Sequence, residues 1–582
     1  MIISTLCDYY SVLERRGETL SPAYSRVNIT HALVLSADGT PVEIICKKRR
    51  EGKSEICESV IMPRRTEKPA VEANIVEHRA AYLFGAEGDN LEVTAKSQKQ
   101  HEAFKQATLD FFEGLDDPLC RAFVLFAGNW SPAEAKTDAM LLGCAADLKT
   151  ARLAICLDGR LDVYLHDLEC VKRRWEERYA QMSAAEDTLS AQCPIFGKEL
   201  PVARIHNKIK GLKGGQSSGC SLVSFNSDAE NSYGREQSYN SAISVKAMEE
   251  YTFALNYLLQ SREHRTYLGD MTVVHFALAG DETEYVGAVN SIFDRDDEKL
   301  SPEDTERSLK AIWLNVKAGS KTEFGVVADD DTEYCMFGLV PNVSRIAVRF
   351  SYRNTFGTLR NNVLRYHEDF AVDALPYAPP LWRIVTSLMS AQKNEKVLSN
   401  MASDLLGAVI SGGQIPQDIF LAALARVKTD RKVTDVIAGL LKACLIRKTI
   451  KKYKEKITMA LNESNHDASY LCGRLFAVLE KIQLEASGGS LNKTIKDTYF
   501  SSAAATPAVI FARLIQLSQK HLAKIENEGR AIYFNKLMTE IIDDMDVFPK
   551  TLSLEEQAEF ILGYYQQVKV FYTKKTDDKE EK

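Results

Sequence analysis

The chain has 582 residues, which is long enough to bury large hydrophobic cores and predicts about four domains. Its net charge of −7 excludes a globally basic nucleic-acid binder, so any contact with nucleic acid must come from local basic patches. The 12 cysteines form no C-x-x-C pair or zinc-like Cys/His cluster, so we expect reduced cytosolic thiols and no metal or other cofactor. No apolar run can span a bilayer, so we expect no membrane partner.

Residues 1–243 mix helix and strand signals. Two Asp-Gly turns, Asp38-Gly39 and Asp158-Gly159, each separate two β-rich runs, which is typical of a hairpin. An apolar run at 121–127 has the length of a strand. The elements expected here are a helix at 2–16, hairpins at 32–46 and 151–165, a strand at 121–127, and a helix carrying Lys172, Arg173, Arg174 and Arg178.

A charged loop at 47–53 leads to Pro63-Arg64-Arg65 and Lys68. Glutamates dilute its positive charge, so a solvated loop and a nucleic-acid contact are equally supported. Asn74 follows, just before a helix expected around 80–82. An Asn in this place is more often a helix cap, although its side chain can also bond the edges of bases.

The stretch 204–256 concentrates residues that suit nucleic acid. Lys208, Lys210 and Lys213 run into the turn Gly214–Gly219, and a polar segment and a helix from about Ser244 follow a short strand expected at 222–225. Glycines let backbone N–H groups approach an anion, and lysines neutralise phosphate charge. The alternative is an ordinary tight turn with its lysines in water, which composition alone favours.

The segment 244–375 adds strands at 271–279 and 334–340, and a loop at 282–308 before a helix that reaches about Lys317. In a third strand, at 345–353, Arg345, Arg349 and Arg353 alternate with apolar residues, which would place all three on one face of a sheet. Such a row suits a phosphate backbone, because Arg binds phosphate with a bidentate fork. Ion pairs with acidic neighbours on an exposed strand are the alternative.

From Pro376 onward the strand signals stop and apolar residues recur at helical spacing. Ser553-Leu554-Glu555-Glu556 is a capping box that predicts the start of the last helix. A basic run at 447–456 contains Glu455 as its single acid. The expected fold class is an α+β N-terminal region with mixed or antiparallel sheets, followed by an all-α C-terminal helical bundle.

One motif indicates chemistry. The run 215–219 fits the G-x-S-x-G nucleophile elbow, with Ser217 as the nucleophile. An elbow needs a strand before it and a helix after it, whereas a lysine-rich segment and a β-like run flank this one. The ten histidines form no cluster that would serve a metal nuclease. We therefore expect no enzyme, with a serine hydrolase that uses Ser217 as the alternative.

The longest distinctive motif is GGQSSGCSLVSFNSDAENSYGREQSYNSAIS at 214–244. Shorter motifs are CDYY at 7–10, MPRR at 62–65, LGDMTVV at 268–274, RIAVRF at 345–350 and FPKTLSLE at 548–555. In content and order they resemble the large subunit of the type I-C CRISPR interference complex, Cascade, over nearly the whole chain.

The resemblance implies a non-catalytic subunit of an RNA-guided antiviral surveillance complex in a prokaryotic cytoplasm. Such a subunit would recognise the protospacer-adjacent motif in duplex DNA, help to unwind the target, guide the displaced strand and recruit a helicase-nuclease. Its partners would be the guide RNA and target DNA, the backbone and guide-5′-end subunits of Cascade, a small subunit and the helicase-nuclease.

The resemblance, together with the basic and polar residues, implies a division of labour along the chain. We expect an α+β region at 1–243 for motif recognition and nucleic-acid contact, a second α+β region at 244–375, and a helical bundle at 376–582. Candidates near the motif are Arg64, Arg65, Lys68 and Asn74. Nucleic-acid contacts are expected from Lys208, Lys210, Lys213, Gly214, Gly215, Gln216, Ser217, Asn226, Asn240, Arg345, Arg349 and Arg353.

In the family, the small subunit is translated from inside the large-subunit gene. Met459 is the internal start expected here, because the fragment 459–582 would contain most of the terminal bundle. A purely structural scaffold, whose basic patches contact only protein, is the other alternative function.

Overall fold

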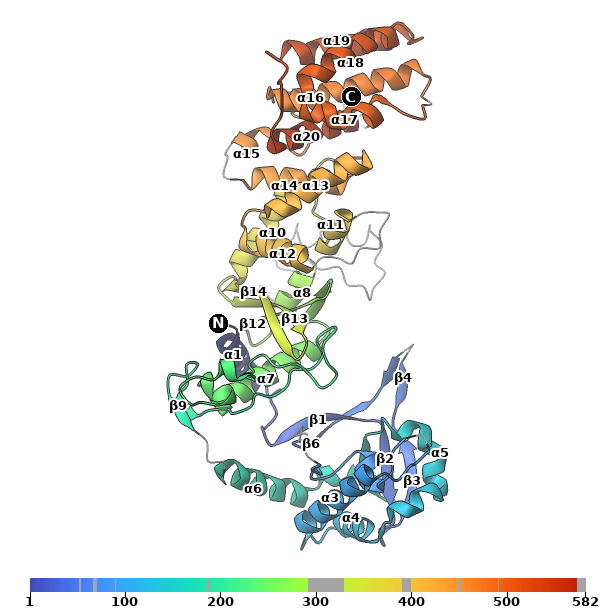
Figure 1. Ribbon diagram of the computed structural model, residues 1–582, viewed down its shortest axis with the longest axis vertical. Helices are drawn as coiled ribbons and strands as arrows, with labels where there is room; N and C mark the ends of the chain where they lie inside the picture. Colours follow the sequence, from blue (N-terminus) through green and yellow to red (C-terminus); the bar gives the residue numbers. More distant parts are fainter. Residues whose placement is uncertain are drawn as a thin grey trace, which may run out of the picture. The chain divides into compact units, whose positions relative to one another are not determined.

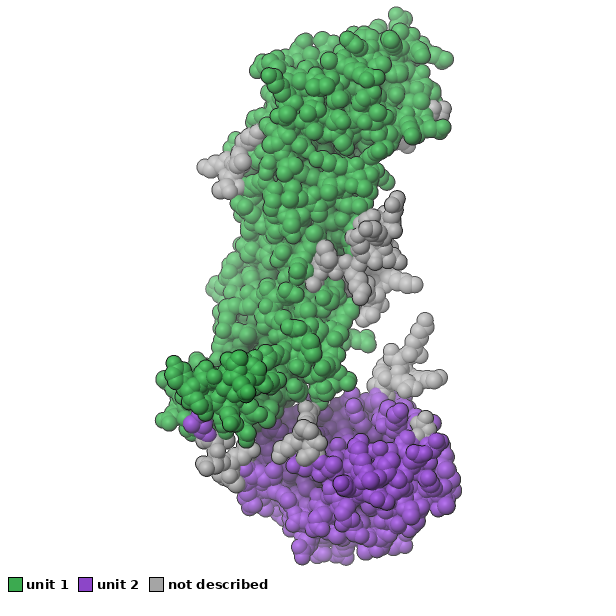
Figure 2. All heavy atoms as spheres, viewed as in Figure 1, with its two compact units in different colours: residues 1–16, 190–582 green, residues 17–189 purple. Residues whose placement is uncertain are grey.

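The computed structural model describes residues 1–51, 54–65, 71–88, 90–185, 189–290, 329–389, 399–448, 452–489 and 491–572. The chain divides into two compact units, which Figure 2 draws in different colours. Unit 1 contains Met1–Arg16 and Ser190–Lys582, and unit 2 contains Gly17–Leu189. The first helix of the chain therefore belongs to the same unit as its C-terminal part. The boundaries predicted after residues 243 and 375 both fall inside unit 1.

Unit 2 is built on a four-stranded mixed sheet with the strand order β3-β2-β7-β8. β2 (His31–Leu35) pairs antiparallel with β3 (Pro41–Cys46) and parallel with β7 (Leu153–Leu157), which pairs antiparallel with β8 (Arg160–Tyr164). Both predicted hairpins are thereby confirmed. The other strands and helices of unit 2 are β1 (Tyr24–Ile29), β4 (Arg49–Glu51), β5 (Ser54–Ile56), β6 (Glu58–Pro63), α2 (Ala80–Phe84), α3 (Ala95–Phe112), α4 (Pro118–Asn129), α5 (Ala139–Leu148) and α6 (Glu169–Ala185).

The strand predicted at 121–127 is wrong, because these residues lie in α4. Asp117 caps this helix by accepting a hydrogen bond from the N–H of Leu119 at 2.8 Å, and Pro118 occupies the first turn. Phe123 and Phe126 are fully buried in the core of unit 2. A short apolar run does not distinguish a buried helix from a strand, so only the Asp-Pro start could have predicted this helix.

Unit 1 contains an antiparallel sheet in the order β11 (Arg265–Leu268), β12 (Met271–Ala277), β13 (Glu333–Asn342) and β14 (Arg345–Thr355). One face packs on α1 (Ile2–Arg15) and α7 (Val245–Gln260), and the other contributes to the core of the C-terminal helices (Figure 1). Because both faces are covered, every residue of β12 is buried. The two α-helices and three strands predicted here are confirmed. A short hairpin, β9 (Ser190–Gln192) with β10 (Glu199–Pro201), precedes the sheet.

The loop predicted at 282–308 begins instead with a helix, α8 (Thr283–Asn290). Asp281 accepts a hydrogen bond from the N–H of Thr283 at 3.0 Å, so a single acidic residue starts this helix. The rest of the predicted loop, and the helix predicted to reach Lys317, lie outside the described residues.

Beyond β14 the described part of the chain contains only helices and their connections, which confirms the all-α C-terminal part. The predicted capping box also forms, since the Ser553 N–H donates to Glu556 Oε2 at 2.7 Å and the Glu556 N–H donates to Ser553 Oγ at 3.3 Å. The helices are α10 (Phe356–Phe370), α11 (Leu381–Ser387), α12 (Ser399–Ser411), α13 (Gln417–Asp430), α14 (Asp435–Ile446), α15 (Lys452–Lys456), α16 (Ala468–Ala486), α17 (Ile495–Ala505), α18 (Pro507–Leu522), α19 (Glu528–Asp543) and α20 (Leu554–Tyr572).

Helices α16 and α20 cross with their backbones in contact at two glycines. A Cβ added to Gly473 of α16 would lie 2.0 Å from the carbonyl oxygen of Phe560, and one added to Gly563 of α20 would lie 2.3 Å from that of Tyr470. The crossing therefore depends on the absence of a side chain at both positions. No helix among the described residues is long and apolar enough to cross a membrane.

Candidate nucleic-acid interface

The glycine-rich loop is closed at its base by Ile209 and Cys220. Each donates its N–H to the carbonyl of the other at 2.8 Å, as an antiparallel pair does. Ser221 then joins the start of β14, because its N–H donates to the carbonyl of Ser344 at 2.8 Å and its own carbonyl accepts from Ile346 at 2.9 Å. These bonds fasten the loop to an edge strand of the sheet in unit 1. The strand predicted at 222–225 is wrong, since these residues form bends and irregular backbone.

Three glycines in this loop have left-handed backbone. Their φ angles are +90° at Gly211, +76° at Gly214 and +94° at Gly219. A Cβ added to Gly219 would lie 2.9 Å from the Cβ of Lys208 and 3.0 Å from the carbonyl oxygen of Ile209. Glycine is therefore required at Gly219 both for its conformation and for the close approach of the two arms of the loop.

Two successive turns shape the tip of the loop. The N–H of Gly215 donates to the carbonyl of Leu212 at 3.1 Å, and the N–H of Gly219 donates to the carbonyl of Gln216 at 2.9 Å. Both glycine N–H groups are thus engaged within the loop, whereas the side chains of Gln216 and Ser217 reach solvent. The side chains of the tip are accessible to a ligand, but the N–H groups of Gly215 and Gly219 donate to carbonyls within the loop.

The predicted lysines differ in their surroundings. The Lys208 ammonium donates to the Ser221 hydroxyl at 2.8 Å, a contact that does not neutralise its charge. The backbone N–H of Lys210 donates to the Asn256 side chain on α7 at 2.8 Å, so the loop is anchored to that helix. Lys213 is exposed and lies nearer to the tip. The three positive charges therefore belong to a loop whose position is set by α7 and β14.

Lys213 reaches the turn between β11 and β12. Its ammonium donates to the carbonyl of Gly269 at 3.2 Å and lies 5.2 Å from the centroid of the Tyr267 ring. The Arg265 guanidinium lies 5.8 Å from the same ring. Sequence analysis missed Tyr267 and Arg265. Their i, i+2 spacing in a strand indicated a shared face, but their contact with Lys213 joins distant parts of the chain.

The polar segment that follows is held by Glu230. This carboxylate accepts hydrogen bonds from the N–H groups of Asn226 at 2.6 Å and Ser227 at 3.1 Å, and it pairs with the Arg345 guanidinium at 2.9 Å. The two backbone donors and Arg345 hold the pKa of Glu230 below its usual range. Arg345 therefore fastens this segment to the sheet in the structure.

Asn240 holds the same segment from its other end. Its carbonyl oxygen accepts from the N–H of Ser232 at 3.0 Å, and its amide donates to the carbonyls of Arg235 at 3.0 Å and Gln237 at 2.9 Å. The predicted polar contact with nucleic acid would require this amide to leave its four partners within its own loop, the fourth being Asn231 Oδ1 at 3.5 Å. In the structure, Asn240 positions the loop.

The strand that carries the three arginines contains a β-bulge. Gly338 of β13 pairs with Phe350 of β14, but the next residue, Leu339, pairs with Val348, so Arg349 has no partner opposite it. The extra residue reverses the alternation of side chains along β14. A simple period of two does not hold over 345–353.

The prediction that the three arginines share one face is therefore wrong. Before the bulge, Ile346 enters the core beside α1 and α7, whereas after it Tyr352 packs on the core of the C-terminal helices. Arg345 and Arg353 lie on opposite sides of the bulge at positions that face opposite sides of the sheet. Arg349 lies at the bulge itself and is exposed.

Two of these arginines are already paired with acidic groups. Arg353 contacts Asp8 of α1 at 2.7 Å and Glu333 of β13 at 2.7 Å, and these carboxylates raise the pKa of its guanidinium. Arg345 is paired with Glu230, as described above. The alternative of an ion-paired strand therefore describes both residues in the structure.

The basic run of the helical part is also largely neutralised within the described residues. Arg447 is buried, and its side chain contacts Asp369 and the carbonyl oxygens of Ala408 and Gly413. Other cations of this run have acidic partners in the same unit. They are Lys448, which pairs with Glu555, and Lys456, which pairs with Asp467 at 2.5 Å. These ion pairs connect helices, so each of these three cations would have to leave an acidic partner to bind a phosphate.

In unit 2, Asn74, one of the residues predicted to lie near the protospacer-adjacent motif, contacts Glu77, which is fully buried. Glu77 accepts from the N–H of Asn74 at 2.9 Å and the side chain of Asn74 at 3.3 Å, and it pairs with Arg79 at 2.6 Å. Burial alone would raise the pKa of Glu77, but Arg79 and the other donors lower it to about 2. Asn74 is buried and part of this network, so a base contact would first have to break it.

Arg65 and Arg64 also contact their own fold. Arg65 is half-buried and donates to the carbonyls of Pro63, Ile75 and Val76 at 2.8, 3.0 and 2.8 Å, so it joins β6 to the segment before α2. Burial lowers its pKa to about 10. Arg64 donates to the Tyr179 hydroxyl at 2.7 Å. The fourth candidate, Lys68, lies outside the described residues.

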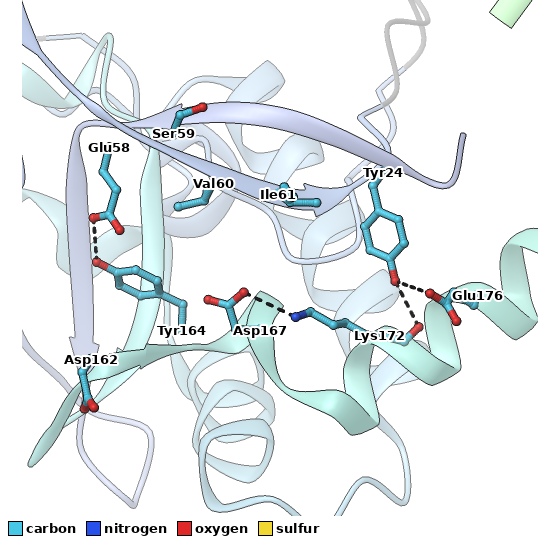
Figure 3. A pocket seen from close by; sticks show the side chains of 10 residues that line it. All are labelled: Tyr24, Glu58, Ser59, Val60, Ile61, Asp162, Tyr164, Asp167, Lys172 and Glu176. Carbon is cyan, nitrogen blue, oxygen red and sulfur yellow. Dashed lines mark hydrogen bonds and ion pairs between the residues drawn. The ribbon is translucent and has the colours of Figure 1, made fainter. Parts of the chain in front are cut away.

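A shallow pocket of about 530 Å³ in unit 2 is acidic rather than basic, and it opens between β6, β8 and the start of α6 (Figure 3). Glu58 accepts from the Tyr164 hydroxyl at 3.2 Å, and Asp167 pairs with Lys172 at 3.6 Å. Asp162 and Glu176 also line it. Four carboxylates against one lysine give the pocket an excess of negative charge, which repels phosphate.

The motifs occur in one order along nearly the whole chain, and a known protein family matches the chain over the same extent. The model of the family described as CRISPR-associated protein Cas_Csd1 matches residues 6–572, nearly the full length. The chain belongs to this family. It is the family of the large subunit of type I-C Cascade, so the resemblance inferred from the motifs is confirmed. No curated protein matches the chain. As a Cas_Csd1 protein, the chain has its partners in a CRISPR complex.

In this Cas_Csd1 chain, Ser217 does not lie in a nucleophile elbow. The two turns around it lead into the bridge residues Cys220 and Ser221, and no helix follows directly. His206, upstream of the loop, is buried and bonded through Nδ1 to the Tyr251 hydroxyl at 2.6 Å. The described residues contain no group of three or more His, Cys, Asp or Glu side chains that could hold a metal ion.

Proposed function

We propose that this Cascade large subunit binds nucleic acid non-catalytically through the glycine-rich loop. In a prokaryotic cytoplasm it would recognise the protospacer-adjacent motif in duplex DNA, help to unwind the target, guide the displaced strand and recruit a helicase-nuclease. The observation that carries the proposal is the position of Lys208, Lys210 and Lys213 on an anchored loop with an exposed polar tip.

The distribution of ion pairs supports this choice of site. Arg345, Arg353 and Arg447 are held by carboxylates of their own fold, so binding a phosphate would require them to exchange one anionic partner for another. Lys208 and Lys213 instead contact a hydroxyl and a carbonyl, which do not cancel a positive charge. A phosphate near the loop would therefore gain the full electrostatic attraction of these two lysines.

For unit 2 we assign a role in motif recognition to the surface next to β6 and α2. There Arg65 and Asn74 act as positioning residues, because their bonds to backbone and to Glu77 hold the segment 72–79 in place. Disrupting either residue would displace that surface. Arg64, whose side chain donates to the Tyr179 hydroxyl, is the candidate among them for a direct contact.

Charge removal in the assembled complex tests the proposal. Glutamine at Lys208, Lys210 and Lys213 together should weaken binding of target DNA and lower the slope of log affinity against log salt by about 0.9 for each phosphate that is no longer neutralised. Lys246→Gln is the matched control, since Lys246 is an exposed lysine of α7 paired with Glu250 at 3.8 Å. Band shifts on target DNA and on DNA with an altered motif measure both quantities.

An unchanged affinity and an unchanged salt slope in the triple variant would refute the loop as a nucleic-acid site. If the unchanged complex itself fails to distinguish target from motif-altered DNA, the scaffold alternative is favoured instead. A loss of affinity equal in the triple variant and in Lys246→Gln would indicate a general effect of surface charge.

We also propose that a small subunit arises by internal translation at Met459. This residue lies between α15 and α16 and is 41% exposed, so a fragment beginning there contains α16 to α20, including the glycine crossing. Mass spectrometry of the expressed complex should detect a fragment that begins at or near Met459. A Met459→Leu change in the gene should remove it, and its absence from the unchanged complex would refute this origin.

A further inference from the structure

The edge strand β11 carries two outward side chains beside the glycine-rich loop. Thr266 and Leu268 are buried, whereas Arg265 is half-buried and Tyr267 is 41% exposed. Residues two apart in a strand point to the same side, so Arg265 and Tyr267 share the face that Lys213 reaches. The sheet and the loop together place two cations close to one aromatic ring.

Neither of these two cations has an acidic partner among the residues that the structure describes. Lys213 donates to the carbonyl of Gly269, and Arg265 donates to the carbonyl of Leu259 at the end of α7. Neither forms an ion pair with a carboxylate in the part of the chain that the structure describes. The chain has a net charge of −7, and Arg345 and Arg353 of β14 are paired with carboxylates. The two cations near the Tyr267 ring differ from these arginines because no carboxylate among the described residues pairs with them.

We infer that Tyr267, Lys213 and Arg265 form a binding site for an unpaired nucleotide. The base would stack on the exposed side of the Tyr267 ring, and the two cations would contact the phosphates on either side of it. Lys213 has a flexible stem and can move from the ring to a phosphate, whereas Arg265 keeps its bond to α7. The inference rests on the proposed function, because it specifies which form of nucleic acid would contact the loop.

The geometry favours a single strand over a duplex. A ring on the edge of a sheet can stack only on a base whose flat face is open, and bases within a duplex are already stacked on their neighbours. Stacking accepts every base, so the site would hold a strand without reading its sequence. The two sources of such a nucleotide are the guide RNA and the displaced DNA strand.

A fluorescent base distinguishes these sources in the assembled complex. In one arm, 2-aminopurine replaces single bases at the 5′ end of the guide RNA, without target DNA. In the other, it replaces bases of the displaced strand next to the motif. Stacking on an aromatic ring quenches its emission, so quenching that disappears in Tyr267→Leu identifies the strand. If quenching at every position in both arms persists in this variant, the inference is overturned.

Affinity and salt dependence separate stacking from charge. Tyr267→Leu should weaken binding of the strand so identified by about tenfold and leave the salt slope unchanged. Tyr267→Phe is the matched control and should stay within about twofold, because it keeps the ring. Lys213→Gln and Arg265→Gln should each lower the salt slope by about 0.7, the value for one phosphate of a single strand.

Tyr267→Ile, with a β-branched side chain that favours strands, replaces the leucine variant if the latter fails to assemble. Affinity within about twofold of the unchanged complex in Tyr267→Leu would overturn the inference and leave the proposed function intact. Absence of all salt-dependent binding in the unchanged complex would instead remove the proposed function, and this inference with it.

Discussion

The glycine crossing of α16 and α20 yields a stability prediction that can be worked out from distances. In Gly473→Ala the new Cβ would lie 2.0 Å from the carbonyl oxygen of Phe560 and 2.8 Å from the backbone nitrogen of Tyr564. Cβ contacts under 3.0 Å essentially never occur, so the two backbones must separate by at least about 1 Å. Both contacts are with backbone atoms, which cannot rotate away as the end of a side chain can.

We expect this separation to outweigh the intrinsic preference of alanine for helix. Alanine gains about 1 kcal/mol over glycine in a helix interior. Forcing a methyl group into a packed contact typically costs about 1–3 kcal/mol, and more where backbones must move. Because two backbones must move here, we take the upper part of this range, about 2–3 kcal/mol. The net change should therefore be a loss of about 1–2 kcal/mol in the free energy that opens these helices, which corresponds to about 5- to 30-fold faster local opening.

Hydrogen exchange of backbone amides in the full chain measures this opening helix by helix. Gly407→Ala in α12 is the matched control, because a Cβ at this helical glycine meets no atom within 4 Å. It should slow exchange in α12, whereas Gly473→Ala should accelerate exchange in α16 and α20. Unchanged or slower exchange in α16 and α20 of Gly473→Ala would refute the reasoning that the crossing is limited by backbone contact.

Three further predictions concern single side chains. Arg353→Met should lower the melting temperature without changing the salt slope of DNA binding, because Arg353 is paired with two carboxylates of its own fold. Arg349→Gln should leave the melting temperature unchanged, and it should lower the salt slope if Arg349 contacts a phosphate. Glu230→Gln should accelerate proteolysis within 226–240, because it removes the charge that pairs with the sheet; proteolysis at the rate of the unchanged chain would contradict this. Burial lowers the pKa of His206 to about 4, whereas its pKa in an unfolded chain is near 6.5. As the pH falls, the unfolded state therefore binds the proton before the folded state does. The contribution of His206 to stability is lost as the pH falls from about 6.5 to 4. His206→Gln should flatten this part of an acid-unfolding curve, and an identical curve would contradict it.

Features that depend on neighbouring residues were predictable from the sequence. The Asp158-Gly159 hairpin and the Ser553 capping box each require only a few consecutive residues, and both formed as expected. The helical character of the C-terminal part followed from apolar spacing repeated over many turns. Long motifs identified the family, because their order along the chain is itself information.

Features that depend on distant partners were not predictable. The bulge at Arg349 reverses the faces of β14, yet nothing in the alternating sequence marks an extra residue. The acidic partner of Arg447 is Asp369, 78 residues away, so the sequence around Arg447 gives no sign that its charge is paired in the fold. In the same way, Tyr267 became a candidate only when the structure placed Lys213 beside it.

The membership of α1 in unit 1 has a consequence for synthesis on the ribosome. Tyr9 donates to Glu282 at 2.7 Å and Asp8 pairs with Arg353, so the surface that receives this helix is complete only after Arg353 has been translated. Unit 2, at 17–189, emerges in between as a contiguous segment and can fold while the first helix still waits with its apolar side uncovered. A chaperone that shields short amphipathic segments of nascent chains would therefore find a substrate in α1 until Arg353 has been translated.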